Sequence, residues 1–133
     1  MRFIDTNIFL RYLTGDDVKK ATESLRLLKK IESNEEKVTT SSLVIFETIF
    51  TLGSFYKVSR EEIRDLLLPI LRLRGLRLEN KEIFEKALEI YSVNKISFAD
   101  IYNSCLMESQ GIKEIYSYDE DFDKISEIKR IEP

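Results

Sequence analysis

The chain has 133 residues, of which 43% are apolar and 34% charged, and its formal net charge is −3. This length and apolar content predict one folded domain, residues 1–133, and argue against disorder. The sequence contains no histidine and one cysteine, which excludes His-based acid–base catalysis, Ser-His-Asp triads, an intrachain disulfide and the usual zinc ligand sets. The chemistry that remains is that of carboxylates.

The location expected from the sequence is the cytoplasm. The uncharged stretches are shorter than a membrane span, and the N-terminus enters a strand instead of a signal peptide. We therefore expect a soluble protein with no membrane partner. Cys105 has apolar neighbours and is expected to be buried. The net charge does not indicate an electrostatic nucleic-acid binder, but clustered catalytic acids would themselves add negative charge, so this argument is weak.

The first half of the chain predicts strands that alternate with helices. Strands are expected at 2–4 and 37–40, and helices at 6–13, 16–32 and 41–56. Asp, Ser or Thr stands at the expected start of each helix, and Gly15 follows the first one. The helix at 41–56 is apolar almost all round, so we expect it to be buried.

The second half continues the alternation. A helix that begins near Ser59 should be kinked or ended early by Pro69 and stopped by Gly75. Strands are expected at 76–78, 114–117 and 128–131, helices from 80 and from 97, and a short helical turn at 119–125. This order predicts an α/β fold in which a parallel sheet of four to five strands is flanked by helices on both faces.

Solitary acids interrupt otherwise uncharged segments. Asp5 ends the first apolar run, Glu47 is the only charged residue in 38–56, and Asp100 is the only one in 96–107. A further acidic pair follows the apolar run at 115–118: Asp119 and Asp121. Buried carboxylates must be paired, hydrogen-bonded or bound to metal, and ligands of open α/β sheets bind at the carboxyl ends of strands. The acids are therefore the candidate site.

Oxygen ligands without His or Cys select hard divalent cations, Mg²⁺ or Mn²⁺, and such sites perform phosphoryl chemistry. We expect metal binding and catalysis from Asp5, Glu47, Asp100 and Asp119, provided that the fold brings them together. Asp121 is either a ligand or a supporting group. Thr6, Asn7 and Ser117 are expected to orient carboxylates or waters. No positive side chain is expected to offset the acids, so their mutual repulsion should raise at least one pKa.

Four motifs together resemble a known family. Residues 3–7 (Phe-Ile-Asp-Thr-Asn) are similar to the opening motif of PIN-domain ribonucleases, and Glu47 stands where their second acid is expected. Residues 98–100 (Phe-Ala-Asp) resemble the third motif, and residues 117–122 (Ser-Tyr-Asp-Glu-Asp-Phe) the closing one. Within the family the chain is most similar to VapC-type toxins of prokaryotic toxin–antitoxin pairs. The resemblance implies a PIN-like domain, a Mg²⁺- or Mn²⁺-dependent endoribonuclease acting on single-stranded or structured RNA, a homodimer and a small antitoxin protein as partner.

Structural roles are the alternative for each acid. Asp5 could cap a helix, Glu47 could be exposed, Asp100 fits the fourth position of a capping box, and acids at 119 and 121 are favoured by a helix dipole. Three other functions remain open. They are a non-catalytic interaction module on a PIN scaffold, a Mg²⁺-dependent phosphatase, in which Asn7 would replace the second expected Asp, and a receiver domain, for which we find no suitably placed lysine.

Overall fold

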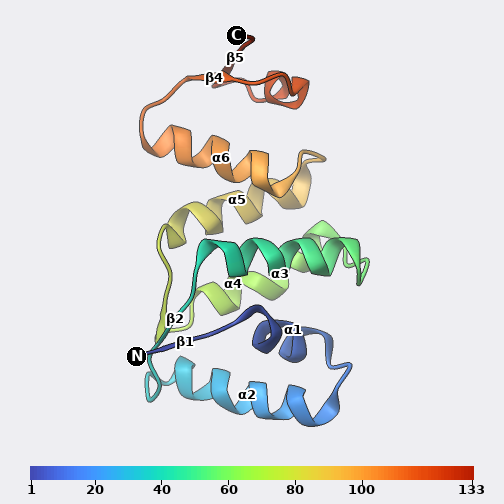
Figure 1. Cartoon of the computed structure of the whole chain (residues 1–133), viewed down its shortest axis with the longest axis vertical. Coiled ribbons are helices and arrows are strands. Elements are labelled where there is room, and N and C mark those ends of the chain that lie inside the picture. Colours follow the sequence, from blue (N-terminus) through green and yellow to red (C-terminus); the bar gives the residue numbers. More distant parts are fainter. The chain divides into compact units, whose positions relative to one another are not determined.

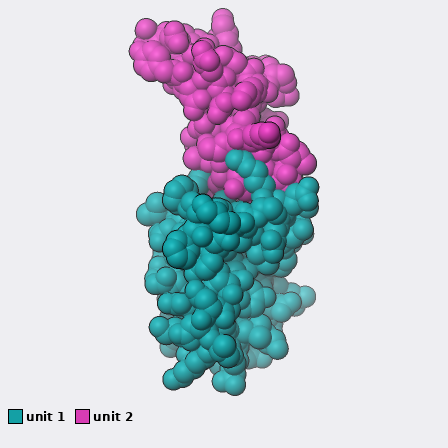
Figure 2. Space-filling view, turned by 90° about the vertical axis from the view of Figure 1, so that its right-hand side faces the viewer, with its two compact units in different colours: residues 1–81 teal, residues 82–133 magenta.

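The computed structural model describes residues 1–133, and the chain divides into two compact units. Unit 1 is Met1–Lys81 and unit 2 is Glu82–Pro133 (Figure 2). Each unit has its own helices and its own parallel strands (Figure 1). No helix combines the length and apolar character that a membrane span requires.

Unit 1 contains a three-stranded parallel sheet in the order β1-β2-β3. Its register places Arg2 opposite Val38, and Val38 opposite Leu76. The strands and helices that make up this unit are, in chain order, β1 (Arg2–Phe3), α1 (Thr6–Thr14), α2 (Val18–Glu32), β2 (Val38–Thr39), α3 (Ser42–Ser54), α4 (Arg60–Leu71) and β3 (Leu76–Arg77).

Helix starts in unit 1 are set by side-chain caps at the positions expected from the sequence. Asp17 accepts a hydrogen bond from the Lys20 amide at the start of α2. Ser41 and Ser59 act in the same way at the starts of α3 and α4. A capping oxygen satisfies a backbone N–H that has no partner within the helix, which is why these residues define where each helix begins. Gly15 ends α1 with a φ of 65°, which is easily adopted only without a Cβ.

Helix α3 is not buried on all sides, and the prediction that it would be is wrong. Its buried face carries Val44, Ile45, Thr48, Ile49 and Leu52. Leu43 and Phe50, by contrast, keep 74% and 73% of their surface exposed. Composition identified an apolar helix, but the packing partners decide which of its faces is covered. Phe55, just after the helix, is also exposed.

Gly75 has a different role from the predicted one. Helix α4 continues through Pro69 and ends at Leu71, so Gly75 does not stop it. Instead, the Gly75 amide donates to the Ile31 carbonyl at 2.9 Å, and its own carbonyl accepts from Val38. A Cβ at this position would clash with the carbonyl oxygens of Ile31 and Glu36. Glycine is therefore required by the close approach of two backbone segments.

Unit 2 is built on two helices, a pair of parallel strands and a short 3₁₀ helix. These elements are α5 (Lys81–Val93), which begins at the last residue of unit 1, α6 (Phe98–Ser109), β4 (Glu114–Tyr116), η1 (Glu120–Lys124) and β5 (Lys129–Ile131). The two helices pack through aromatic rings: the ring centroids of Phe84 and Tyr102 are 4.6 Å apart, and those of Tyr91 and Phe98 are 5.5 Å apart. Cys105 is buried as expected, and this burial raises the pKa of its thiol.

The predicted α/β class with parallel strands is confirmed. The strands are shorter than expected, and they form a three-stranded sheet in unit 1 and a two-stranded sheet in unit 2. Strand periodicity predicts that a segment is extended. It does not define how many residues pair, because pairing depends on the neighbouring strand.

The close approach at Gly75 can be tested by substitution. Gly75→Ala should destabilise the protein by about 1–3 kcal/mol, because the added methyl group has to push backbone carbonyls apart. The exposed neighbour Arg74 provides the control, since Arg74→Ala should change the unfolding free energy by less than about 0.5 kcal/mol. Urea unfolding followed by circular dichroism measures both changes. If Gly75→Ala is as stable as wild type, the backbone around Gly75 can accommodate a methyl group without cost, and glycine is not required there.

Candidate metal centre

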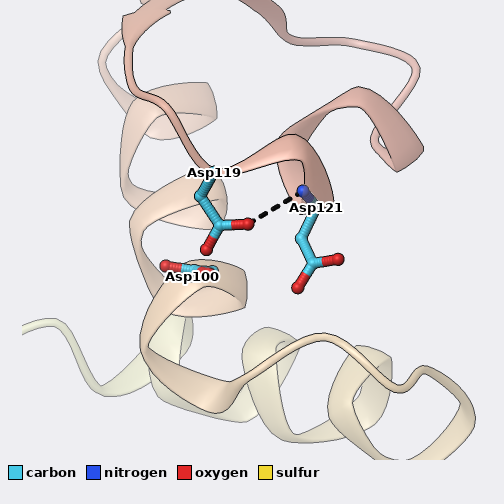
Figure 3. Close-up of side chains that lie close together, drawn as sticks. All are labelled: Asp100, Asp119 and Asp121. Atoms are coloured by element: carbon cyan, nitrogen blue, oxygen red, sulfur yellow. Dashed lines mark hydrogen bonds between the residues drawn. The ribbon is translucent and has the colours of Figure 1, made fainter.

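Three aspartates of unit 2 converge in space. One carboxylate oxygen from each of Asp100, Asp119 and Asp121 lies within 4.8 Å of the others (Figure 3). Asp100 comes from the first turn of α6, and the other two come from the segment that links β4 to η1. All three are acids that the sequence pattern indicates as metal ligands or supporting groups, and the structure brings them together.

The start of α6 fixes the position of Asp100. Ser97 caps the helix, and its hydroxyl oxygen accepts from the Asp100 amide at 3.3 Å. Asp100 therefore occupies the fourth position of the cap, where its carboxylate points toward the β4–η1 segment (Figure 3). The capping role and the cluster role are compatible, because the cap is what orients the carboxylate.

Hydrogen bonds within the acidic segment fix the other two carboxylates. The Ser117 hydroxyl accepts from the Asp119 amide at 3.0 Å, and the Asp119 carboxylate accepts from the Asp121 amide at 2.9 Å (Figure 3). Asp119 is thereby the N-cap of η1. The buried ring of Phe122 anchors the same turn in the core. Ser117, expected to orient the acids, contacts the backbone at Asp119.

The charge balance of the cluster is uneven. The pKa of Asp100 is raised, first by burial and then by the negative charges of Asp119 and Asp121, while a hydrogen bond from Ser97 opposes the shift. The expected rise of at least one pKa is therefore found, although burial is its largest cause. The expectation that no positive side chain offsets the acids is wrong, because Lys124 Nζ lies 2.8 Å from Asp121 Oδ1.

Two cationic residues near the cluster were missed in the sequence. Lys124 follows Asp121 by three positions, a spacing at which helical side chains meet, so this ion pair could have been predicted. Arg130 hydrogen-bonds the Ser117 carbonyl and the Asp123 carboxylate. No sequence signal identifies this contact, because it depends on how β5 pairs with β4.

The remaining predicted site residues belong to unit 1. Asp5 is exposed and caps α1, with its Oδ1 accepting from the Thr6 amide at 2.7 Å. Thr6 is only 3% exposed, and its hydroxyl oxygen has no hydrogen-bond partner. Asn7 is exposed and lines a surface hollow of about 420 Å³. Glu47 is exposed on the same side of α3 as Leu43 and Phe50.

The donor chemistry of the cluster fits a divalent cation. The three aspartates offer oxygen ligands only, and oxygen-rich sites without nitrogen or sulfur favour Mg²⁺, Mn²⁺ or Ca²⁺. Repulsion among the carboxylates is also relieved when a cation binds between them. We therefore take Asp100, Asp119 and Asp121 as the residues of unit 2 that would bind such a metal.

The chain is similar to known proteins along nearly its whole length. The PIN domain family model matches residues 2–128. A "VapC ribonuclease" of Aquifex aeolicus (strain VF5) is 29% identical over 133 residues, which is 100% of this chain and 97% of that protein. The crystal structure of Mycobacterium tuberculosis VapC20, described as a sarcin-ricin loop cleaving toxin, aligns over 100% of both chains with 24% identity and a TM-score of 0.41.

The raised pKa of Asp100 predicts a stability effect with a defined sign. A carboxyl whose folded pKa is raised costs stability once it ionises, so the cost is absent below its ordinary pKa and complete above the raised one. Asp100→Asn should therefore raise the melting temperature in EDTA at pH 7, and this gain should shrink as the pH falls through the carboxyl range. Saturating Mn²⁺ should reduce or reverse it, since the cation stabilises wild type by mass action.

Scanning calorimetry at several pH values measures this effect, with Glu23→Gln on the exposed face of α2 as the control. If Asp100→Asn melts below wild type in EDTA at pH 7, the carboxylate stabilises the fold as a capping group more than repulsion destabilises it.

Proposed function

Because the chain belongs to the PIN-domain family, we propose that it is a metal-dependent endoribonuclease and the toxin of a toxin–antitoxin pair. The observation that carries this proposal is the convergence of Asp100, Asp119 and Asp121 at the third and closing motifs of the family. The relative from Aquifex aeolicus, a ribonuclease by name that matches the whole chain, supports the same activity.

We infer that residues 1–133 form one PIN-like domain and that Asp5 and Glu47 complete the site. The family match supports this inference because it spans both units. Both acids are exposed and therefore available to a ligand. The buried Thr6 hydroxyl next to Asp5 supports it as well, because a buried polar group without a protein partner is uncommon and is free to bind a water or ligand. Asn7 then becomes a residue that orients the metal-bound groups, as does Ser117.

The reaction follows from the donor set. Bound Mg²⁺ or Mn²⁺ would lower the pKa of a water molecule and stabilise charge on the leaving oxygen. The carboxylates position the cations, and the Ser97 and Ser117 hydroxyls fix the backbone amides of two of these acids. Water attacks the phosphorus, the bond to the 3′ oxygen breaks, and that oxygen leaves as a hydroxyl. The chain has no histidine to deprotonate a 2′-hydroxyl, so the products carry a 5′-phosphate and a 3′-hydroxyl.

Loss of a single metal ligand tests the activity. Asp100→Asn, Asp119→Asn, Asp5→Asn and Glu47→Gln should each reduce Mn²⁺-dependent cleavage of an RNA panel by about 100-fold or more, because metal occupancy and transition-state stabilisation are lost together. EDTA should abolish wild-type cleavage, and mass spectrometry should find 5′-phosphate ends. Parallel reactions with Mg²⁺ and Mn²⁺ establish the preferred ion.

A matched control is Glu35→Gln, which removes an exposed acid between α2 and β2 and should cleave like wild type. A 2′,3′-cyclic phosphate end would exclude the water mechanism. Wild type that binds Mn²⁺ but cleaves no RNA would leave a non-catalytic PIN module, and release of phosphate from small esters would identify a phosphatase.

The proposed assembly is a cytoplasmic homodimer inhibited by a small antitoxin protein. Unit 1 carries exposed apolar side chains on α3 and just beyond it: Leu43, Phe50 and Phe55. Clustered exposed apolar residues are typical of protein interfaces. We propose that this face of α3 forms the dimer contact. Glu47 lies on the same side of α3 and has to stay accessible to bind the metal, so the proposed contact stops short of its carboxylate.

The dimer contact can be tested by light scattering at micromolar concentration. Wild type should have the mass of two chains, and Phe50→Glu should shift it to one, because a charge at the centre of an apolar contact is desolvated without a partner. Val93 is a matched control, since its side chain is 77% exposed in unit 2 and Val93→Glu should remain a dimer. A monomeric wild type would contradict the proposal.

A further inference from the structure

We propose that Arg130 is a positioning residue that holds the acidic segment 117–123 in the shape that metal binding requires. The inference rests on the proposed function in one respect, namely that Asp119 and Asp121 of this segment bind a divalent cation. It concerns a residue outside the four family motifs, on the last strand of the chain.

The guanidinium of Arg130 joins the two ends of the segment. Its Nη1 donates to the Ser117 carbonyl at 3.1 Å, just before Asp119. Its Nε and Nη2 donate to the two carboxylate oxygens of Asp123 at 3.1 and 3.2 Å, just after Asp121. The side chain is only 15% exposed, which limits competition from water. Asp119 and Asp121, the proposed metal ligands of the segment, therefore lie between the two points that Arg130 holds.

The chemistry of the contact suits a positioning role. A guanidinium presents its N–H groups in a rigid planar fork, and a bidentate pair with a carboxylate fixes direction as well as distance. The backbone of Arg130 is itself held in place, because β5 pairs with β4 and the Ser117 amide donates to the Ile131 carbonyl at 3.1 Å. The hydrogen bonds within the segment are local and span two residues each. Arg130 supplies the longer connection that closes the loop.

The segment needs such a connection because its acids repel one another. In the metal-free state, repulsion among Asp100, Asp119 and Asp121 favours separation of the β4–η1 segment from α6. The hydrogen bonds of Arg130 end within the segment and β5, so they oppose the part of this repulsion that acts between Asp119 and Asp121, by fixing Ser117 and Asp123 on either side of these acids. The guanidinium pairs with neither Asp119 nor Asp121 and leaves both carboxylates available for metal. Lys124 differs in this respect, since it pairs directly with Asp121 and would compete with a cation.

A positioning role and a simple charge effect predict opposite changes in cation affinity when Arg130 is replaced. If Arg130 acted only through its positive charge, removing it would strengthen cation binding, whereas removing the negative charge of Asp123 would weaken it. If Arg130 positions the segment, both Arg130→Met and Asp123→Asn weaken binding. Arg130→Lys sharpens the distinction, because it keeps the charge but loses the bidentate fork.

The experiment measures Mn²⁺ affinity of the full-length protein by calorimetry, without RNA. We expect Arg130→Met, Arg130→Lys and Asp123→Asn each to weaken binding by about 10-fold, a typical effect of losing a group that orients metal ligands. The double variant Arg130→Met/Asp123→Asn should be no weaker than the single variants, since both remove one contact. Glu132→Gln is the matched control: Glu132 also accepts from Arg130, at 3.1 Å, but lies outside the segment, so its loss should leave the affinity unchanged.

Amide hydrogen exchange in EDTA provides a readout that needs no metal. Residues 117–124 should exchange faster in Arg130→Met and Asp123→Asn than in wild type and Glu132→Gln, while α5 and α6 keep their protection. The latter also shows that the variants remain folded. If Arg130→Met binds Mn²⁺ as tightly as wild type or more tightly, or if segment exchange is unchanged, the positioning role is overturned.

The outcomes separate this inference from the proposed function. Wild type that binds Mn²⁺ but cleaves no RNA, with weaker binding in the Arg130 variants, would refute the nuclease and support the positioning role. If wild type cleaves RNA and the Arg130 variants bind Mn²⁺ as tightly as wild type, the nuclease is supported and the positioning role is refuted. Absence of Mn²⁺ binding by wild type would overturn both.

Discussion

Electrostatic repulsion among neighbouring carboxylates is the constraint on which the acidic centre of unit 2 depends. Three aspartates lie with carboxylate oxygens within 4.8 Å of one another, and the partial burial of Asp100 makes its ionisation costlier still. Such an arrangement persists only if the surrounding structure holds the acids in place or if a cation binds between them. The features around the cluster can be understood as solutions to this one problem.

Helix and turn caps provide the first solution. The bonds at Ser97, Ser117 and Asp119 use backbone amides that a helix or turn start would otherwise leave unsatisfied. The same bonds orient the acids, so local stability and site geometry are obtained from one set of contacts. A structural reading of these acids as caps and a functional reading as ligands are therefore not alternatives. The cap determines where the carboxylate points.

Cationic side chains provide the second solution, and they act differently. Lys124 neutralises Asp121 directly. Arg130 pairs with Asp123 and the Ser117 carbonyl, beside the cluster but not with its acids. Because Arg130 pairs with Asp123 and not with the three clustered aspartates, the cluster keeps its negative charge and can attract a metal cation. In unit 1, the exposed Leu43 and Phe50 lie on the same face of α3 as Glu47, so the proposed dimer contact and this acid are neighbours.

The helical segments, the candidate acids and the family resemblance could all be predicted from the sequence. These properties depend on local signals: a cap at Asp17, Ser41, Ser59 or Ser97, an apolar period, or one acid in an uncharged stretch. The three-dimensional structure was needed to show which face of α3 is exposed, why position 75 is glycine, and that Arg130 reaches Asp123 and Ser117. Each of these depends on contacts between segments far apart in the chain or paired as strands, for which a single sequence carries no periodic or capping signal.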